Sequence, residues 1–230
     1  MKNLAIIAAR SGSKRIPNKN TKQFHNKPII SYPISAAITA GCFDTVMVST
    51  DSDLIANLAI SIGASVPFLR SKETSSDDAT TTDVVNEVLN RYSKIGIQFD
   101  RVCCIYATAA FITPKIILDC LNIFSDPNID AVVPVCKFRP PIWRSFNIVN
   151  KNLNWIWGGL RSVKSQDLQD SYHDAGLCFW VTTKAFQETG QIIGRNTRPL
   201  IISSNYCQDI DNQEDWEIAE LKFNQIIKCA

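Results

Sequence analysis

Residues 4–20, LAIIAARSGSKRIPNKN, decide how the fold begins: an apolar, strand-like run ends at Ala9 and a short basic loop follows it directly. Gly12 relaxes the backbone of this loop, so that peptide N–H groups can turn toward an anion. The hydroxyls and cations around it are Ser11, Ser13, Arg10, Lys14, Arg15 and Lys19. Serine donors and several cations together are typical of a phosphate site at the end of a first strand.

The charge distribution supports the same interpretation. The first acidic residue is Asp44, and the 43 residues before it contain seven Lys or Arg. Such a one-sided stretch favours a polyanionic ligand. The whole chain, however, carries a net charge of only +2 with 20% charged residues. The basic loop is therefore a local feature, and we expect no nucleic-acid partner.

The loop matches neither GxxxxGK[ST] nor GxGxxG, because Gly12 stands alone. This excludes the usual signatures of P-loop ATPases and dinucleotide-binding enzymes. The remaining alternative is a solvated basic turn. Its position directly after the first strand argues against that alternative, and Pro17, Asn18 and Asn20 keep the next segment non-helical and close to the loop.

The 230 residues predict a single α/β domain over residues 1–230. Strand-like segments recur at residues 3–9, 45–49, 101–106, 131–135, 177–181 and 200–202. Helix-like segments occupy residues 31–40, 52–62, 81–95, 114–124 and 213–227. Alternating strands and helices predict a mostly parallel sheet flanked by helices, with Asp51 and Thr113 as helix caps. Ligands of such sheets bind at the carboxyl ends of the strands, where the basic loop lies.

Residues 136–172 interrupt the alternation of strands and helices, and they contain three of the five tryptophans. We expect a hairpin-bearing insertion that forms a homodimer through its exposed aromatic side chains. The alternative is a flap packed down on the same chain.

The eight cysteines include no CxxC pair, and several lie in apolar runs. We therefore expect reduced, buried thiols rather than disulfides. With only His25 and His173 as imidazoles, a Cys/His zinc site is not indicated. No apolar run approaches 18 residues, and residues 4–9 are too short for a signal sequence, so we expect a cytoplasmic protein without a membrane partner.

A second constellation follows the apolar run at residues 201–202. Asp209 and Asp211 are two positions apart, so in extended backbone their carboxylates face the same side while Ile210 anchors the other. This spacing suits Mg²⁺, which takes one or two carboxylates together with phosphate oxygens and water. The alternative is that Asp211, or the neighbouring Asn212, only caps the last helix.

The segment SSDDATTTDVV, residues 75–85, is rich in hydroxyls and carboxylates. It could bond a ribose or a base, but a capped helix start has the same composition. Arg70 could contact a base, or it could pair with Asp77 or Asp78.

Several motifs together resemble the cytidylyltransferases that activate nine-carbon sialic-acid-like sugars, the acylneuraminate cytidylyltransferase family. They are IIAARSGSKRIPNKN, STDSDLIANLAISIGA, VPFLR, SDDATTT, IYATAAFIT, SQDLQDSYHDAG and QDIDNQEDW. They follow the family's order over nearly the whole chain. The segments PPIWRSF and KSQDLQDSYHDAG are most similar to the branch that acts on pseudaminic acid.

The resemblance implies a Rossmann-like nucleotide-diphospho-sugar transferase fold and a set of site residues. The implied catalytic residues are Arg10, Lys14, Asp209 and Asp211, with Asp209 and Asp211 as the Mg²⁺ ligands. The implied nucleotide-binding residues are Ala9, Arg10, Ser11, Gly12, Ser13, Lys14, Lys19, Asn20, Arg70, Thr80, Thr81, Tyr106 and Thr108. The implied sugar-binding residues are Arg144, Gln166, His173 and Asp174, with Arg144 placed in this chain's site or in that of a partner subunit.

The chain departs from the family pattern at three positions. Ala8 and Ala110 stand where proline is usual, which predicts less rigid loops at the nucleotide pocket. Trp143 stands beside Arg144 where relatives of the pseudaminic type often carry glutamine, which predicts a reshaped sugar pocket.

The implied reaction is Mg²⁺-dependent condensation of CTP with an acidic nine-carbon sugar, most closely pseudaminic acid, to give a CMP-sugar and pyrophosphate. Legionaminic, 8-epi-legionaminic and N-acetylneuraminic acids are the alternative sugars. The general base is left open between a metal-bound hydroxide and an aspartate. The alternative from another class is a non-catalytic, dimeric nucleotide-binding scaffold, which would not need a converging carboxylate pair.

Overall fold

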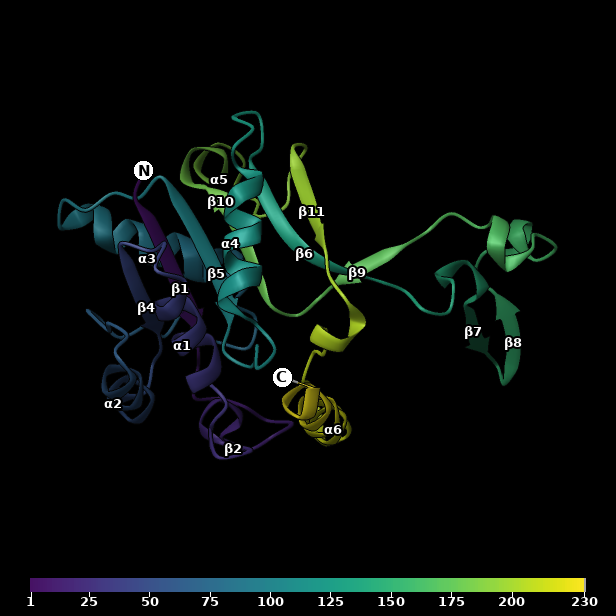
Figure 1. The fold of residues 1–230 in the computed structure, drawn as a ribbon, viewed down its shortest axis with the longest axis horizontal. Helices are drawn as coiled ribbons and strands as arrows, with labels where there is room; N and C mark the ends of the chain where they lie inside the picture. The colour runs from purple at the N-terminus through teal and green to yellow at the C-terminus, as the bar shows by residue number, and fades with distance from the viewer. Residues whose placement is uncertain (230) are drawn as a thin grey trace.

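A seven-stranded sheet forms the centre of the computed structural model, which describes residues 1–229 (Figure 1). Six strands follow the order β11, β6, β10, β5, β1, β4, and β9 pairs with β6 outside that path. The strands are β1 (Asn3–Ala8), β4 (Thr45–Ser49), β5 (Arg101–Tyr106), β6 (Ala131–Lys137), β9 (Tyr172–Asp174), β10 (Cys178–Thr182) and β11 (Thr197–Ile201). A separate small hairpin joins β2 (Gln23–Phe24) to β3 (Lys27–Pro28).

The expected mostly parallel sheet is confirmed, with two reversed strands. β1 runs parallel to both β4 and β5, and β11 runs parallel to β6. β10 is antiparallel to β5 and β6, and β9 is antiparallel to β6. Ala8 lies opposite Ser49 on one side and Tyr106 on the other, so three neighbouring strands end at the same edge. That carboxyl edge carries the basic loop, as expected for a parallel sheet.

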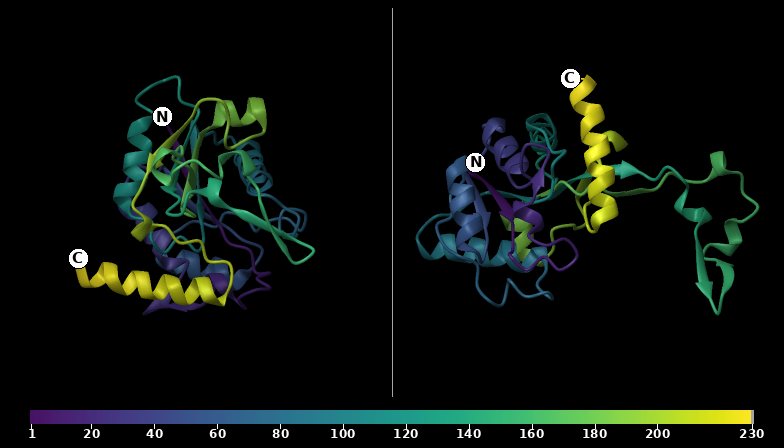
Figure 2. Two further views of the ribbon diagram at one scale, coloured as in Figure 1. Left: turned by 90° about the vertical axis from the view of Figure 1, so that its right-hand side faces the viewer. Right: turned by 90° about the horizontal axis from the view of Figure 1, so that it is seen from below.

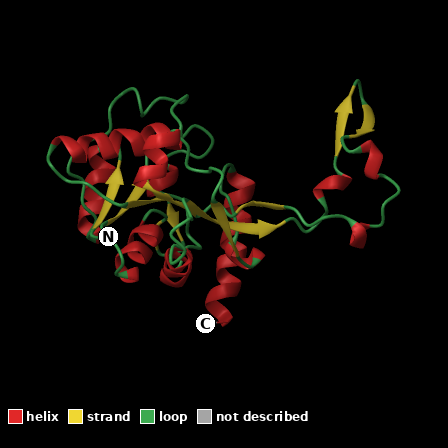
Figure 3. Ribbon diagram, turned by 90° about the horizontal axis from the view of Figure 1, so that it is seen from above, coloured by secondary structure: helices red, strands yellow, loops and turns green. Residues whose placement is uncertain are grey.

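Helices cover both faces of the sheet (Figure 3). They are α1 (Ser31–Ala40), α2 (Asp53–Ile62), α3 (Thr81–Lys94), α4 (Pro114–Ile123), α5 (Thr183–Thr189) and α6 (Gln213–Cys229). Alternate residues of β1 separate two apolar cores: Ala5 and Ile7 join the core with α1, α2, α4 and α6, whereas Leu4 and Ile6 join the core with α3 and α5. This two-sided burial explains why residues 4–8 of β1 are all apolar rather than alternating with polar residues.

The helix starts confirm one predicted cap and correct another. Thr113 caps α4 by accepting a hydrogen bond from the Ile116 N–H at 3.2 Å. Asp51 was expected to cap α2, but Ser52 does so, because the Asp51 carboxylate is bonded to Ser11 instead.

The start of α6 leaves Asp211 free of a capping role. The Asn212 side chain accepts from the Asp215 N–H at 3.0 Å, and the Asp215 carboxylate accepts from the Asn212 N–H at 3.0 Å. This reciprocal pair satisfies two donors that the first turn leaves without intrahelical partners. The alternative in which Asp211 caps this helix is therefore wrong.

Residues 138–171, here called the arm, project from the sheet on the antiparallel pair β6–β9 (Figure 2). Within the arm, β7 (Phe146–Val149) pairs with β8 (Asn152–Trp155), and both turn residues, Asn150 and Lys151, have positive φ as in a type I′ hairpin. Every residue of both strands is exposed. The predicted hairpin insertion is thus present, and the alternative of a packed-down flap is wrong.

Seven cysteines have described side chains, and none of these seven is in a disulfide. Six of them are buried, in agreement with the expected reduced thiols, and Cys42 is half-buried. The side chain of Cys229 lies outside the described residues. Over residues 1–229, no helix combines the length and the apolar character needed to cross a bilayer.

Candidate active site

Two adjoining hollows open at the carboxyl edge of β1, β4 and β5. The first, here called the loop hollow, has a volume of about 270 Å³ and is lined by the basic loop together with Asp77 and Asp211. The second, here called the strand hollow, has a volume of about 220 Å³. Its lining includes Ala8, Arg70, Thr80, Thr81, Tyr106 and Thr108. Arg10, Lys19 and Asn20 line both hollows, so a ligand could occupy them together.

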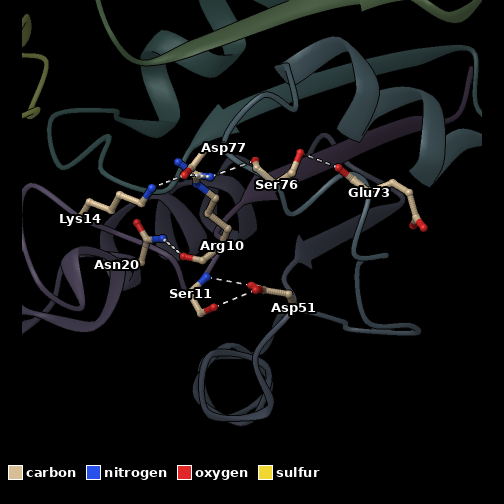
Figure 4. A network of polar contacts seen from close by, with 8 residues as sticks. All are labelled: Arg10, Ser11, Lys14, Asn20, Asp51, Glu73, Ser76 and Asp77. Carbon is tan, nitrogen blue, oxygen red and sulfur yellow. Dashed lines mark hydrogen bonds and ion pairs between the residues drawn. The ribbon is translucent and has the colours of Figure 1, made fainter.

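The basic loop is held in place by two polar side chains. The Asn20 amide donates to the Arg10 carbonyl at 2.9 Å, and the N–H and hydroxyl of Ser11 each donate to the Asp51 carboxylate at 2.7 Å (Figure 4). Desolvation opposes ionisation of Asp51, but the bonds from Ser11 outweigh it and lower the pKa of this carboxyl. Asp51 therefore anchors the loop, a role that sequence reasoning missed.

Two cations of the loop are paired with one carboxylate. The Arg10 guanidinium donates to Asp77 at 2.8 Å and to the Ser76 carbonyl at 2.9 Å, and Lys14 binds the other oxygen of Asp77 (Figure 4). The bond from Lys14, followed by that from Arg10, lowers the pKa of Asp77. Asp77 had been considered as a partner for Arg70, and that pairing is wrong. In this structure Asp77 forms ion pairs with Arg10 and Lys14, the cations that an anionic ligand would need.

Arg70 is fixed in the wall of the strand hollow. Its side chain is among the buried polar groups, and its guanidinium donates to the Ser49 hydroxyl at 3.0 Å and to the Ser49 carbonyl at 2.6 Å. Both contacts are to the last residue of β4, so the sheet edge sets the position of the positive charge.

The hydroxyl-rich segment before α3 is a capped helix start. The Thr80 hydroxyl accepts from the Asp83 N–H at 3.2 Å, and the Asp83 carboxylate accepts from the Thr80 N–H at 2.8 Å. This capping box confirms the structural alternative for Thr80. Thr80 and Thr81 nevertheless line the strand hollow, so both can also face a ligand there.

The loop at Ala110 is ordered without proline. The Ala109 N–H donates to the Tyr106 carbonyl at 3.1 Å, and the Ala110 N–H donates to the Thr108 carbonyl at 2.7 Å. Ala110 is also buried, at 4% exposure. Hydrogen bonds and packing therefore hold this turn in the absence of a pyrrolidine ring, and its lower rigidity stays a prediction.

The predicted carboxylate pair lies against the basic loop, although nearly 200 residues separate them in sequence. The Lys19 ammonium donates to the Ile210 carbonyl at 2.6 Å and lies 3.9 Å from Asp211. Arg15 pairs with Asp211 at 2.7 Å. Ile210 is fully buried, as the alternation predicted.

The electrostatics of the pair suit a hard cation. Desolvation, followed by the charge of Asp211, raises the pKa of Asp209. Desolvation also lowers the pKa of Lys19, against the opposing effect of both carboxylates. A like-charged pair of oxygen donors is stabilised by a divalent ion, and carboxylates with open positions are the ligands that Mg²⁺ takes in phosphate sites. Asp209 and Asp211 therefore fit this ion.

Asp174 connects the carboxylate pair to β5. The Tyr106 hydroxyl donates to Asp174 at 3.2 Å, and the Gly176 N–H donates to its other oxygen at 2.9 Å. Desolvation raises the pKa of both Tyr106 and Asp174. Gly176 has a φ of 70°, and a Cβ there would lie 3.4 Å from the Asp209 Cα, so only glycine fits without strain.

A third hollow of about 690 Å³ lies at the base of the arm. His173, Asp209 and Asp211 contribute to its lining, together with Arg139 and Gln208. It adjoins the loop hollow, because Asp211 lines both. This base hollow is larger than the loop hollow and could receive a second substrate.

The predicted sugar-binding set is divided between two places. His173 and Asp174 lie at the base of the arm, whereas Arg144 and Gln166 lie within it. Arg144 donates to the Val163 carbonyl at 2.6 Å, a contact inside the arm. The structure therefore does not bring Arg144 and Gln166 to the three hollows of their own chain. For Arg144 this leaves the alternative of a partner subunit's site, and for Gln166 it differs from the expected place beside His173 and Asp174.

Trp143 also stays within the arm. Its indole N–H donates to the Gln169 carbonyl at 2.7 Å, and its ring packs against Trp157 at a centroid distance of 5.1 Å. In this chain Trp143 stabilises the arm and does not line the base hollow.

Comparison with known proteins gives consistent matches over the whole chain. A family model described as cytidylyltransferase matches residues 4–137. The chain is 36% identical to the pseudaminic acid cytidylyltransferase of Campylobacter jejuni subsp. jejuni serotype O:2, covering 97% of both chains. It is 32% identical to the CMP-N,N'-diacetyllegionaminic acid synthase of Legionella pneumophila, covering 98% of both.

Among solved structures, the fold matches CMP:2-keto-3-deoxy-manno-octonic acid synthetase complexed with CTP. The TM-score is 0.72 at 15% sequence identity, covering 98% of this chain and 99% of that one. The match confirms the nucleotidyltransferase fold expected from the sequence.

Proposed function

Because the chain belongs to the cytidylyltransferase family, we propose that it condenses CTP with pseudaminic acid, a nine-carbon α-keto acid sugar, to give a CMP-sugar and pyrophosphate. One observation carries this proposal: the basic loop and the carboxylate pair meet at one edge of the sheet, with the Lys19 ammonium 2.6 Å from the Ile210 carbonyl. A simple nucleotide binder would need the cations but not the carboxylates.

In the proposed reaction the anomeric hydroxyl oxygen of the sugar attacks the α-phosphorus of CTP, and pyrophosphate leaves. Arg10 and Lys14 stabilise the negative charge that develops on the α-phosphate and on the leaving group. Their pairing with Asp77 must open when the triphosphate binds, because one guanidinium edge and one ammonium are engaged there.

The strand hollow is the proposed cytidine site. Arg70, Tyr106 and Thr108 would face the base and ribose from the ends of β4 and β5, with Thr80 and Thr81 opposite them. Gly12, Ser13 and Asn20 would surround the phosphates together with Lys19, whereas Ser11 is bonded to Asp51 and lies outside the lining of both hollows. The shared lining of the two hollows supports one nucleotide spanning both.

Mg²⁺ is the proposed cofactor, with Asp209 and Asp211 as its ligands. When bound, it would neutralise phosphate charge and act as a Lewis acid. The raised pKa of Asp209 supports this assignment, since desolvation and then the charge of Asp211 disfavour the ionised carboxyl, and a divalent ion would offset both effects. Arg15 would exchange its contact with Asp211 for one with phosphate.

We further propose a homodimer in which the arm serves the partner subunit. The arm exposes Ile148 at 74% and Leu153 at 65%, with Phe146 and Trp157 also exposed. Burial of such a patch against a second copy is favourable. In that arrangement Arg144 and Gln166 would reach the base hollow of the partner, where His173 and Asp174 lie.

Mixing two inactive variants tests the shared site. Arg144→Ala removes the proposed arm contact, and Asp209→Ala removes the metal ligand. If the arm acts on the partner, co-refolded mixtures regain about a quarter of wild-type activity, because half of the dimers are mixed and one of their two sites is intact. If the arm serves its own chain, every site stays defective. Gln166→Ala, at an exposed residue of the 3₁₀ helix η4 (Ser165–Asp167), replaces Arg144→Ala should the arm misfold.

The reaction is tested by pyrophosphate release with CTP and Mg²⁺ across pseudaminic, legionaminic, 8-epi-legionaminic and N-acetylneuraminic acids. Turnover with pseudaminic acid is expected. The Legionella relative favours legionaminic acid as the second candidate. CTP binding without turnover on any acid would instead favour a non-catalytic scaffold.

A further inference from the structure

A cluster of soft metal ligands lies at the base of the arm, apart from the carboxylate pair. The side-chain ligand atoms of Cys136, His173 and Cys207 all lie within 4.8 Å of one another. They come from three separate segments: β6, β9 and the residue after the 3₁₀ helix η5 (Ser204–Tyr206). No local spacing links them, which is why a search for CxxC could not find them.

The fold explains how these residues meet. Cys136 lies directly opposite His173 in the antiparallel pair β6–β9, where side chains of facing residues are neighbours. Cys207 follows the segment that leaves β11, which runs parallel to β6. The Lys222 ammonium donates a hydrogen bond to the Cys207 carbonyl at 2.8 Å, so the backbone at Cys207 is also anchored to α6.

The spacing is close to that of a tetrahedral site. A Zn–S bond of about 2.3 Å and a tetrahedral angle place two bound sulfurs about 3.8 Å apart. The ligand atoms here are at most 4.8 Å apart, so the two sulfurs need to approach each other by no more than about 1 Å. Rotation of the cysteine side chains can supply such a shift.

His173 is held in a form that can bind a metal. Its Nδ1 lies 2.8 Å from the Asp174 carbonyl oxygen. A carbonyl oxygen only accepts, so Nδ1 carries the proton and Nε2 has the free lone pair in the neutral ring. A hydrogen bond from the second ring nitrogen to a backbone carbonyl is the usual support for a metal-bound histidine.

The cluster differs from the other cysteines of the protein. Cys103, Cys120 and Cys178 also lie near one another, but they are buried in the apolar core without a histidine. Cys136 and Cys207 are 4% and 7% exposed and line the base hollow together with His173. An ion can therefore reach them, and the hollow has room for water as a fourth ligand.

We propose that Cys136, His173 and Cys207 form a three-ligand site for a thiophilic divalent cation, Zn²⁺, with its fourth position open to the base hollow. Two thiolates and an imidazole select zinc, whereas the carboxylates of Asp209 and Asp211 suit Mg²⁺. The bound ion ties β6 and β9 to the segment that leads to Asp209. The proposal does not depend on which sugar the enzyme uses.

Cobalt substitution tests the site, because Zn²⁺ has no d–d spectrum and Co²⁺ does. Metal-free protein is titrated with Co²⁺ in a phosphine reductant and a large excess of Mg²⁺. The expected result is one equivalent bound with a thiolate-to-cobalt charge-transfer band, which Zn²⁺ then displaces. Zn²⁺ should also raise the melting temperature of the wild-type protein.

Variants assign the ligands. Cys136→Ser and Cys207→Ser should each lower the affinity more than about 100-fold, since loss of a supporting contact alone lowers it about 10- to 100-fold. Cys42→Ser, which alters a half-buried thiol outside the cluster, should keep the band and the affinity. Asp209→Asn should keep the charge-transfer band as well.

Four results would overturn the proposal. They are absence of the band in the wild type, retention of the band in both cysteine variants, loss of zinc binding in Asp209→Asn alone, or formation of a Cys136–Cys207 disulfide in place of metal uptake. If a serine variant melts well below the wild type without metal, His173→Gln provides the independent ligand deletion.

Discussion

Asp77 holds two cations of the basic loop in the free protein, and Asp77→Asn should therefore tighten CTP binding. Asn keeps the size of the side chain but removes the negative charge. Arg10 and Lys14 would then be free to meet the triphosphate, so that no ion pair has to be broken first.

The expected magnitude follows from the geometry of these pairs. The Arg10 and Asp77 side chains are 36% and 49% exposed, and Lys14 is 78% exposed, so both pairs are largely hydrated. Exposed ion pairs contribute little each, and both are lost in the variant, so it should bind CTP about 2- to 30-fold more tightly.

Isothermal titration with CTP and Mg²⁺, in the absence of sugar, measures this affinity without turnover. Asp78→Asn is the matched control, since the neighbouring carboxylate has no hydrogen bond or ion pair within residues 1–229. The control should show only the small general effect of one lost charge, and the difference between the two variants should shrink as salt rises. Weaker CTP binding in Asp77→Asn than in Asp78→Asn would refute the reasoning and make Asp77 a contact of the bound state.

Three further predictions concern the carboxylate pair and its support. Asp209→Ala should lower kcat by about 10²–10³ with CTP binding retained; wild-type turnover in Mg²⁺ would contradict its role. Gly176→Ala and Gly190→Ala both place a side chain at positive φ, 70° and 66°, and each should lose about 1–2 kcal/mol of stability in denaturant melts. Only Gly176→Ala should also lose kcat, because a Cβ at Gly190 meets nothing within 4 Å; equal loss in both variants would argue against the contact with Asp209. Finally, folding raises the pKa of Asp209, so ionisation of this carboxyl destabilises the folded protein as the pH rises through the folded-state pKa. Below the unfolded-state pKa of about 3.9 the carboxyl is protonated in both states, and this destabilisation is absent. Metal-free Asp209→Asn should therefore melt above the wild type at neutral pH, with the difference shrinking toward pH 4; a constant difference at all pH values would exclude the charge as its cause.

Much of the fold was predictable because its signals are local. The strands at Thr45–Ser49 and Arg101–Tyr106 and the helix at Ser31–Ala40 have the bounds that their apolar patterns predict. Thr113 followed by Pro114 is a helix start that two adjacent residues specify. The position of the basic loop also follows from the rule for parallel sheets.

The errors concern side chains whose partners are distant in sequence. Asp51 has the composition of a cap, but Ser11 is 40 residues away and takes its carboxylate. Asp77 was considered as one possible partner of Arg70, yet its partners are 67 and 63 residues away in the basic loop. The resemblance placed Gln166 beside His173 and Asp174, although the arm carries Gln166 away from the base hollow of its own chain.

The sequence by itself determined the alternation of the main strands and helices, the two-sided core and the presence of a basic loop and a carboxylate pair, since each depends on residue types that lie close together in the chain. Only the tertiary structure decided that Asp211 lies beside Arg15, that Asp77 neutralises Arg10 and Lys14, and that Cys136, His173 and Cys207 converge. These contacts arise from the order and direction of strands in the sheet. Hydrophobic periodicity specifies which face of an element is buried, but it leaves open which distant element packs against that face.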